Sequence, residues 1–330
     1  MDMTTVLSPE ETQWAQGRIG TMVSSLNSRI LGQQDLIDAI VVACFAKGNV
    51  LLEGLPGLGK TELVKGLAGL LGLEFRRIQF TPDLLPSDIT GAGVLQEQNG
   101  TREMTFVPGP IFGNLVLADE INRASPRTQS AMLEAMQEQR VSVMGETHVL
   151  PDPFWCMATQ NPIDMEGTYP LPEAQLDRFL FKLHVTKVSS DVLSTIIQSR
   201  RRGRAPAAES VFEPGELNRI FELVEKVFLP TEIADLIGRV VEHTHPIDSS
   251  PDIVRNYVKY GASPRAAIGL AEAVRVRALM NGKPSVGAED VYALAKHVLG
   301  HRIALDYRAK LDGISVWSIV EAVLATERLS

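Results

Sequence analysis

The segment "GLPGLGKT", residues 54–61, constrains the fold of this chain more than any other. It matches G-x-x-x-x-G-K-[ST] at every fixed position, follows the apolar run "NVLLE" and precedes the helical pattern "KTELVKGLAGLLG". In that context the glycines let backbone N–H groups and a helix N-terminus surround a phosphate chain. A glycine-rich turn that merely joins strand to helix is the alternative, and the Lys-Thr pair argues against it. The segment predicts a P-loop, with Lys60 reaching the β- and γ-phosphates and Thr61 ligating Mg²⁺.

The residues that we expect to contact the nucleotide are those of the loop and of the first helical turn. They are Gly54, Leu55, Pro56, Gly57, Leu58, Gly59, Lys60, Thr61 and Glu62.

The first half of the chain alternates between short β-rich runs and helical patterns. Beside "NVLLEG", the strand candidates are "EFRRIQF", "NLVLADE", "FWCMATQ" and "RFLFKLHV". This alternation predicts an α/β fold with a parallel core sheet covered by helices. Two segments, at roughly 91–109 and 141–150, interrupt it and have the pattern of inserted hairpins, with turns at Asn99-Gly100 and near Gly145.

At 330 residues the chain is long enough for about two domains. We expect a helical lead-in at 1–30, an αβα core with both hairpins at 31–198, a solvated linker at 199–210 and a smaller all-α lid domain at 211–330. The linker contains "SRRRGRAPAAES", whose charges are more typical of a solvated connection than of a phosphate site.

Composition excludes several classes of protein. With 45% apolar and 22% charged residues, the chain has the composition of a globular protein. The longest apolar region, at 37–52, is interrupted by charges, and the N-terminus lacks the pattern of a secretory signal, so we expect no membrane span and a cytoplasmic location. A net charge of −8 argues against nucleic acid as the main partner. Cys44 and Cys156 lie in apolar runs, as core thiols do.

Two further strand ends carry polar groups suited to phosphate chemistry. "NLVLADE" ends in Asp119, which can hold the hydration shell of Mg²⁺, and Glu120, which can accept a proton from an attacking water. "FWCMATQNP" ends beside Asn161, whose amide could bind the γ-phosphate and that water. Solvated acids and a simple Asn-Pro turn are the alternatives, and the P-loop upstream argues against both.

The chain resembles AAA+ ATPases and, within them, the MoxR family. The resemblance is carried by "GLPGLGKT", "LADEINRASPRTQSAMLEAM", "ATQNPIDMEGTYPLPEAQLDRF" and "GASPRA", in family order from about residue 32 to the end. Ser125 departs from the proline usual in relatives, but a serine there can still cap the following helix.

The resemblance implies a role for each matching residue. Asp119 would serve Mg²⁺, Glu120 water activation, Asn161 the sensor 1 role and Arg265, at a lid-helix start, the sensor 2 role at the γ-phosphate. Gly32 and Gln33 would pass beside the adenine. The hairpins would be the helix-2 insert and the hairpin before sensor 1.

Arg178 would be an arginine finger that enters the nucleotide site of the next subunit, a contribution of ~10³ to 10⁵ in rate by analogy with arginines supplied to GTPases. A local salt bridge to Glu173 or Asp177 is its alternative reading. Arg123 has the same two readings, an action across the subunit boundary or a local ion pair.

Three functions compete on these observations. The first is a Mg-dependent ATP hydrolase that acts as a homo-oligomeric ring, a hexamer, in chaperone-like remodelling or maturation of partner proteins. A von Willebrand A domain protein would be a separate polypeptide, since D-x-S-x-S is absent from this sequence. The second is a nucleic-acid motor related to MCM helicases, although "VSVMGETHVL" has no Lys or Arg to track a backbone. The third is a nucleotide-gated adaptor with little turnover.

Overall fold

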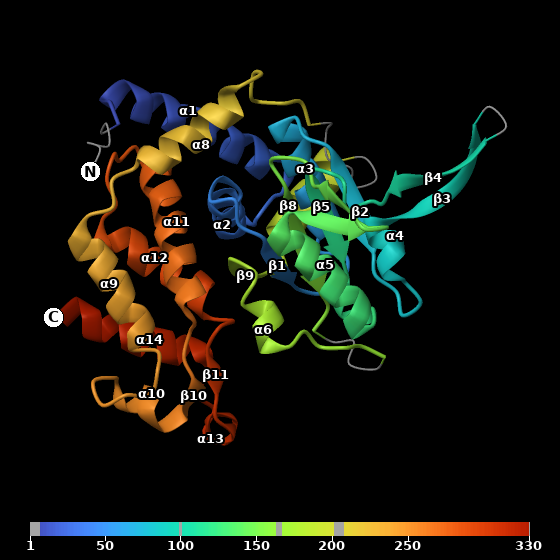
Figure 1. Cartoon of the computed structure of the whole chain (residues 1–330). Coiled ribbons are helices and arrows are strands. Elements are labelled where there is room, and N and C mark those ends of the chain that lie inside the picture. Colours follow the sequence, from blue (N-terminus) through green and yellow to red (C-terminus); the bar gives the residue numbers. More distant parts are fainter. Residues whose placement is uncertain (1–6, 99–100, 163–166, 201–207, 330) are drawn as a thin grey trace.

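The computed structural model describes residues 7–98, 101–162, 167–200 and 208–329. An α/β core lies beside a lid of helices, and one long hairpin projects from the core (Figure 1). The core holds a five-stranded parallel sheet in the order β2-β5-β8-β1-β9. Its strands are β1 (Val50–Glu53), β2 (Phe75–Gln79), β5 (Leu115–Asp119), β8 (Trp155–Gln160) and β9 (Phe181–His184).

The central strands are apolar along their length because both faces of the sheet are covered. Alternate residues point to opposite faces, so Val50 and Leu52 join one hydrophobic cluster while Leu51 joins another. The larger cluster contains inward residues of α1 (Pro9–Arg29), α2 (Gln34–Phe45) and α3 (Lys60–Leu71). The smaller contains those of α5 (Pro126–Glu138), which Ser125 caps as expected.

All five predicted strands are present, but the start predicted for the last one is wrong. The pattern "RFLFKLHV" predicts a strand from Arg178, whereas β9 begins at Phe181, after the one-turn helix α6 (Glu173–Leu176). The carbonyls on either side of Arg178 accept hydrogen bonds from Arg302 in the lid, so this stretch is held outside the sheet.

Both predicted hairpins are confirmed. Strands β3 (Gly91–Gln98) and β4 (Thr101–Pro108), which follow the short helix α4 (Pro86–Thr90), pair antiparallel, and the turn expected at 99–100 lies outside the described residues. Strands β6 (Arg140–Val143) and β7 (Glu146–Val149) turn at Met144 and Gly145, both with positive φ. The hairpins touch where Phe106 stacks on His148 at a centroid distance of 3.9 Å.

The lid is helical and packs directly on the core. Helix α7 (Ser190–Ser199) follows β9, and most of the expected linker at 199–210 lies outside the described residues. The lid helices are α8 (Glu216–Lys226), α9 (Thr231–Glu242), α10 (Asp252–Tyr257), α11 (Pro264–Met280), α12 (Ala288–Leu299), α13 (Tyr307–Leu311) and α14 (Val316–Leu329). A short antiparallel pair that the sequence analysis did not predict, β10 (Val258–Tyr260) with β11 (Ala304–Leu305), joins them.

The larger hydrophobic cluster is continuous from core to lid. Helix α1, the expected lead-in, packs against α3 of the core and against α8 and α11 of the lid, as the upper part of Figure 1 shows. Cys44 and Cys156 are free and buried, and burial raises the pKa of the Cys156 thiol to about 12. Of the helices in the described ranges, none combines the length and the apolarity needed to cross a bilayer.

Candidate functional site

The predicted phosphate-binding loop joins β1 to α3 at the carboxyl edge of the parallel sheet. Gly57 and Gly59 have φ of 80° and 81°, a region that favours glycine. A Cβ on Gly54 would lie 2.8 Å from the carbonyl oxygen of Val185, so glycine lets the loop start against the end of β9. Helix α3 begins at Lys60, and its unpaired N–H groups point toward the loop. The backbone is therefore arranged to bind an anion.

Lys60 connects this loop to the acidic strand end. Its Nζ donates a hydrogen bond to the carbonyl oxygen of Gly54 at 2.6 Å. Burial lowers the pKa of Lys60, while the negative charges of Asp119, Glu120 and Glu53 act in the opposite direction. These three carboxylates therefore lie close enough to Lys60 to act on its charge.

Thr159 holds the two acidic residues in place, and the sequence analysis missed it. Its hydroxyl donates to Asp119 Oδ1 at 2.6 Å and accepts from the backbone N–H of Glu120 at 2.8 Å. Glu120 has a φ of 58°, so the chain leaves strand geometry directly after Asp119. A single hydroxyl in the otherwise apolar run "FWCMAT" was the available signal.

Neighbouring side chains orient the carboxylates further. Arg77 Nη2 lies 2.6 Å from Asp119 Oδ2, and Gln79 Nε2 donates to Glu120 Oε2 at 3.1 Å. Arg123 Nε lies 3.1 Å from the same Glu120 oxygen. The local ion pair expected as one reading of Arg123 is therefore present.

The oxygen donors at this edge fit Mg²⁺ bound together with a nucleotide. Thr61 at the start of α3 offers a hydroxyl, and Asp119 at the end of β5 offers a carboxylate, which are the hard ligands that Mg²⁺ prefers. Asp119 Oδ1 accepts a single hydrogen bond, from Thr159, and therefore keeps capacity to bind the water shell of the ion, whereas Oδ2 accepts two, from Arg77 Nε and Nη2.

Asn161 lies directly after β8, at the same edge of the sheet. It is buried, and it lines a hollow of about 310 Å³ together with Glu53, Gln160 and Asn122. Gln160 is in register with Glu53, the residue before the P-loop. The predicted amide is therefore level with the start of the loop.

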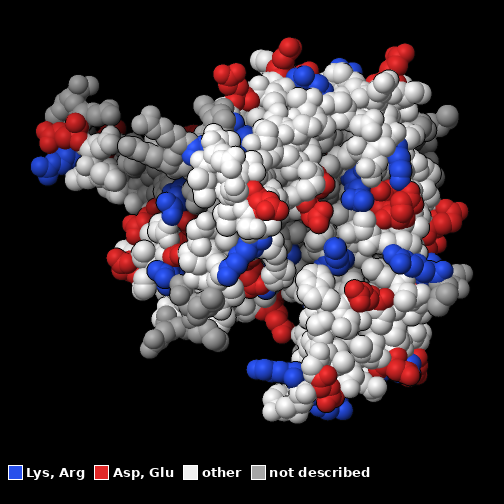
Figure 2. Space-filling model, turned by 180° about the vertical axis from the view of Figure 1, so that it is seen from behind, with Lys and Arg blue, Asp and Glu red and all other residues white. Residues whose placement is uncertain are grey.

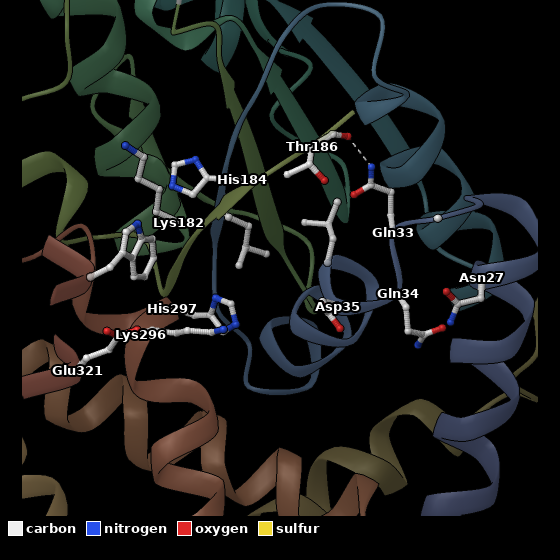
Figure 3. A pocket seen from close by; sticks show the side chains of 14 residues that line it. Asn27, Gln33, Gln34, Asp35, Lys182, His184, Thr186, Lys296, His297 and Glu321 are labelled. Carbon is white, nitrogen blue, oxygen red and sulfur yellow. Dashed lines mark hydrogen bonds between the residues drawn. The ribbon is translucent and has the colours of Figure 1, made fainter. Parts of the chain in front are cut away.

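A larger hollow of about 890 Å³ lies between the core and the lid (Figure 3). Gly32 and Gln33, expected beside the adenine, form part of its wall, and Gln33 Nε2 donates to the carbonyl oxygen of Thr186 at 2.7 Å. Gly32 has a φ of 73°, and a Cβ there would come within 3.1 Å of Val192. The opposite wall is formed by the lid, where Trp317 of α14 approaches the ring of His184 edge-on.

Glu53 ties this hollow to the P-loop. Its carboxylate lies 3.1 Å from Lys182 Nζ and 3.2 Å from His184 Nδ1, and both partners line the hollow. The hydrogen bond with His184, assisted by Lys182, lowers the pKa of Glu53 to about 2. These three residues were not among the predicted site residues, because they come from two strands about 130 positions apart, a separation that local sequence patterns do not bridge.

Arg178 and Arg265 lie at the opposite, amino edge of the sheet. Together they line a hollow of about 340 Å³ that is also lined by Lys47, Gly48 and Asn49, the residues just before β1. Arg265 starts α11, as expected of a lid-helix arginine. The structure brings these two arginines together and does not bring either to the loop at 54–61.

Asp177 is not the partner of Arg178. Its carboxylate accepts from Arg302 Nε at 2.9 Å and from the Ser263 hydroxyl, and lies 3.7 Å from Arg265 Nη1. Arg178 forms no ion pair within the part of the chain that the structure describes, and its Nε is buried there without a hydrogen-bond partner. The local salt bridge considered for Arg178 is therefore wrong.

The family described as "ATPase family associated with various cellular activities (AAA)" matches residues 49–181, and the AAA lid domain matches residues 251–323. Chaperone MoxR1 of Mycobacterium tuberculosis is 44% identical over 301 residues, covering 91% of this chain and 79% of that protein. YeaC of Bacillus subtilis is 42% identical over 312 residues, covering 94% of both chains.

The likeness extends to the fold. A crystal structure from Cytophaga hutchinsonii superimposes with a TM-score of 0.86 at 36% identity, covering 96% of each chain. Protein MoxR of Methylorubrum extorquens is 29% identical over 309 residues, with 84% of each chain covered. The matches cover both the AAA core and the helical lid, and the relatives are similar over nearly the full length. The chain therefore belongs to the MoxR-type AAA ATPases.

Proposed function

We propose that this protein hydrolyses Mg-ATP as a homo-oligomeric ring, a hexamer, in the cytoplasm, and uses the cycle to remodel or mature other proteins. The P-loop and Lys60 bind the phosphates, and Gly32 and Gln33 lie beside the base. Asn161 orients the attacking water, and Glu120 accepts its proton.

Mg²⁺, held by Thr61 and the water shell on Asp119, would supply charge neutralisation at the β- and γ-phosphate oxygens. The protein's part is to keep the acidic groups fixed. Thr159 does this for both Asp119 and Glu120, so their relative position does not depend on flexible side chains.

The position of Arg178 carries the proposal of a ring. Phe181 of β9 is in register with Val50, and the P-loop follows Glu53 at the other end of the same strand pair. Four strand residues span about 13 Å, so Arg178 and the loop of its own chain are separated by the depth of the sheet. An arginine that forms no ion pair with the other described residues, placed at that edge, suits the nucleotide of a neighbouring subunit. We assign Arg265, beside it, to the same neighbour.

A protein client is favoured by the surface of the two hairpins. Exposed apolar side chains gather there, namely Val94, Leu95, Met104, Val107, Met144 and Val149. Arg140 falls within β6, so the second hairpin does carry one arginine, but it pairs with Glu138 at 3.3 Å. Arg102 lies 3.8 Å from Glu97. On the face seen in Figure 2, basic side chains are interspersed with acidic ones.

The partner is then a separate polypeptide, for which a von Willebrand A domain protein is the class implied by the family resemblance. The name of the M. tuberculosis relative, a chaperone, supports this type of function.

Mixed rings test the division of the site between subunits. Arg178→Ala should lower the turnover number by ~10³, and Lys60→Ala should abolish phosphate binding. In an equimolar hexamer about one quarter of the interfaces pair an intact P-loop with an intact finger, as expected of head-to-tail contacts around a ring. Recovery of about that share of wild-type activity is the expected result. No recovery, in rings shown by native mass spectrometry to be mixed, overturns the proposal.

The nucleic-acid motor is tested separately. ATPase rates with single-stranded and with duplex DNA should equal the rate without DNA. Strong stimulation by either would favour the motor over the chaperone-like function.

A further inference from the structure

Arg302 forms hydrogen bonds to the segment that carries Arg178, although it is not one of the proposed catalytic residues. It follows α12 by three residues, and its side chain is only 3% exposed. Every N–H of its guanidinium donates a hydrogen bond, which no other side chain could reproduce. The acceptors are Asp177 Oδ1 (2.9 Å), Leu180 O (3.0 Å), Val298 O (2.6 Å), Asp177 O (3.1 Å) and Phe179 O (2.6 Å).

Four of these five bonds reach residues 177–180, on both sides of Arg178. The adjacent His301 adds another, between its Nε2 and the carbonyl oxygen of Phe179 at 2.9 Å. Burial lowers the pKa of His301 to about 3, so its ring is neutral and Nε2–H serves as the donor. The backbone carbonyls around Arg178 are therefore bound by the lid, while the N–H of Leu180 donates to the carbonyl oxygen of Asn49, directly before β1, at 2.8 Å.

The same contacts fix Arg265. Asp177, held by Arg302, also accepts from the hydroxyl of Ser263, the N-cap of α11, and lies 3.7 Å from Arg265 itself. One buried guanidinium thus sets the position of both arginines assigned to the neighbouring site. Displacements of 1 Å can cost ~10² in rate when a catalytic group must meet a substrate.

We propose that Arg302 is a positioning residue for ATP hydrolysis in the adjacent subunit, because it orders the segment from which Arg178 projects. This rests on the proposed function, in which Arg178 acts across the interface. Arg302 then leaves the P-loop of its own chain unaffected.

Arg302→Gln tests the proposal by showing whether the loss of activity occurs in the variant's own nucleotide site or in that of the neighbouring subunit. It should lower the turnover number by about 10², with the KM for ATP within about threefold of wild type. Mixed with Lys60→Ala subunits, it should recover about one quarter of wild-type activity, because its own P-loop is intact and its neighbour supplies a sound finger. Mixed with Arg178→Ala subunits, it should recover nothing, because both lack a working finger.

Arg275→Gln is the matched control. Arg275 is likewise a lid arginine that donates to a carbonyl, that of Val227 at 2.6 Å, but its side chain is 24% exposed and it lies within α11, away from Arg178. Its turnover number should stay within about twofold of wild type. If Arg302→Gln does not fold by circular dichroism, Arg302→Lys carries the same test, since three donors cannot replace five.

Two results overturn the role of Arg302. One is an unchanged turnover number in the folded variant. The other is failure to complement Lys60→Ala in rings where Arg178→Ala does complement it, which would show a defect in the variant's own site. Failure of the Arg178→Ala mixture itself is a different result, because it removes the shared site and with it both proposals.

Discussion

Glu53→Gln perturbs the link between the P-loop and the hollow at the core–lid boundary. The native carboxylate contacts His184 and Lys182, and its side chain is only 20% exposed. These contacts lower its pKa from 4.5 to about 2. Since one pKa unit corresponds to ~1.4 kcal/mol, the preference for the ionised form is equivalent to about 3 kcal/mol. Glutamine can still accept hydrogen bonds, so we expect a loss of about 2 kcal/mol in the free energy of unfolding at pH 7.

The pH dependence identifies the cause. A carboxyl whose folded pKa is depressed contributes stability above its unfolded pKa and loses it as the pH falls toward the folded value. For Glu53 that window runs from about 4.5 down to about 2. The difference between wild type and Glu53→Gln should therefore be constant from pH 7 to about 5.5 and smaller by about half at pH 3.

Urea unfolding followed by tryptophan fluorescence measures this difference, because Trp155 is buried in the same sheet. Glu74→Gln serves as the control, since Glu74 pairs with Arg76 on an exposed surface and should change stability by less than about 0.5 kcal/mol. A Glu53→Gln difference that stays the same from pH 7 to pH 3 would refute the reasoning.

Three other changes have defined outcomes. Glu120→Gln should bind ATP with wild-type affinity while turnover falls by at least ~10², and undiminished hydrolysis would remove Glu120 from its role. Thr159→Val should raise the Mg²⁺ concentration for half-maximal ATPase activity and lower turnover ~10-fold, because Asp119 and Glu120 lose a common anchor; an unchanged Mg²⁺ titration contradicts this. Trp155→Phe should lower the unfolding free energy by about 2 kcal/mol in a urea titration, because it deletes the bond to Cys44 O and leaves a cavity; a change under about 0.5 kcal/mol counts against it.

The parts of the site that lie within one segment were predictable. The P-loop is one example, because its glycines, lysine and threonine act through local backbone geometry and the helix that follows. The hairpin turn at Met144 and Gly145 is another example, since a two-residue turn of this kind needs positive φ at two adjacent residues. Ser125 capped α5 for the same local reason.

The parts of the site that join distant segments could not be predicted from the sequence. Thr159 meets Asp119 because β8 lies beside β5 in the sheet, an order that no local pattern encodes. Likewise β9 begins three residues later than its apolar pattern predicts, because Arg302, more than 120 positions downstream, donates hydrogen bonds to the backbone carbonyls of that stretch.

The sequence by itself determined which chemistry is expected of this chain, because phosphate and magnesium binding need particular residue types at fixed short spacings. Only the tertiary structure decided the partners of its charged groups. In the tertiary structure Asp177 pairs with Arg302 and Arg265, and Arg178 has no ion pair within the described chain. Charged side chains pair with whatever packing places beside them, and here the docking of the lid on the core makes that choice.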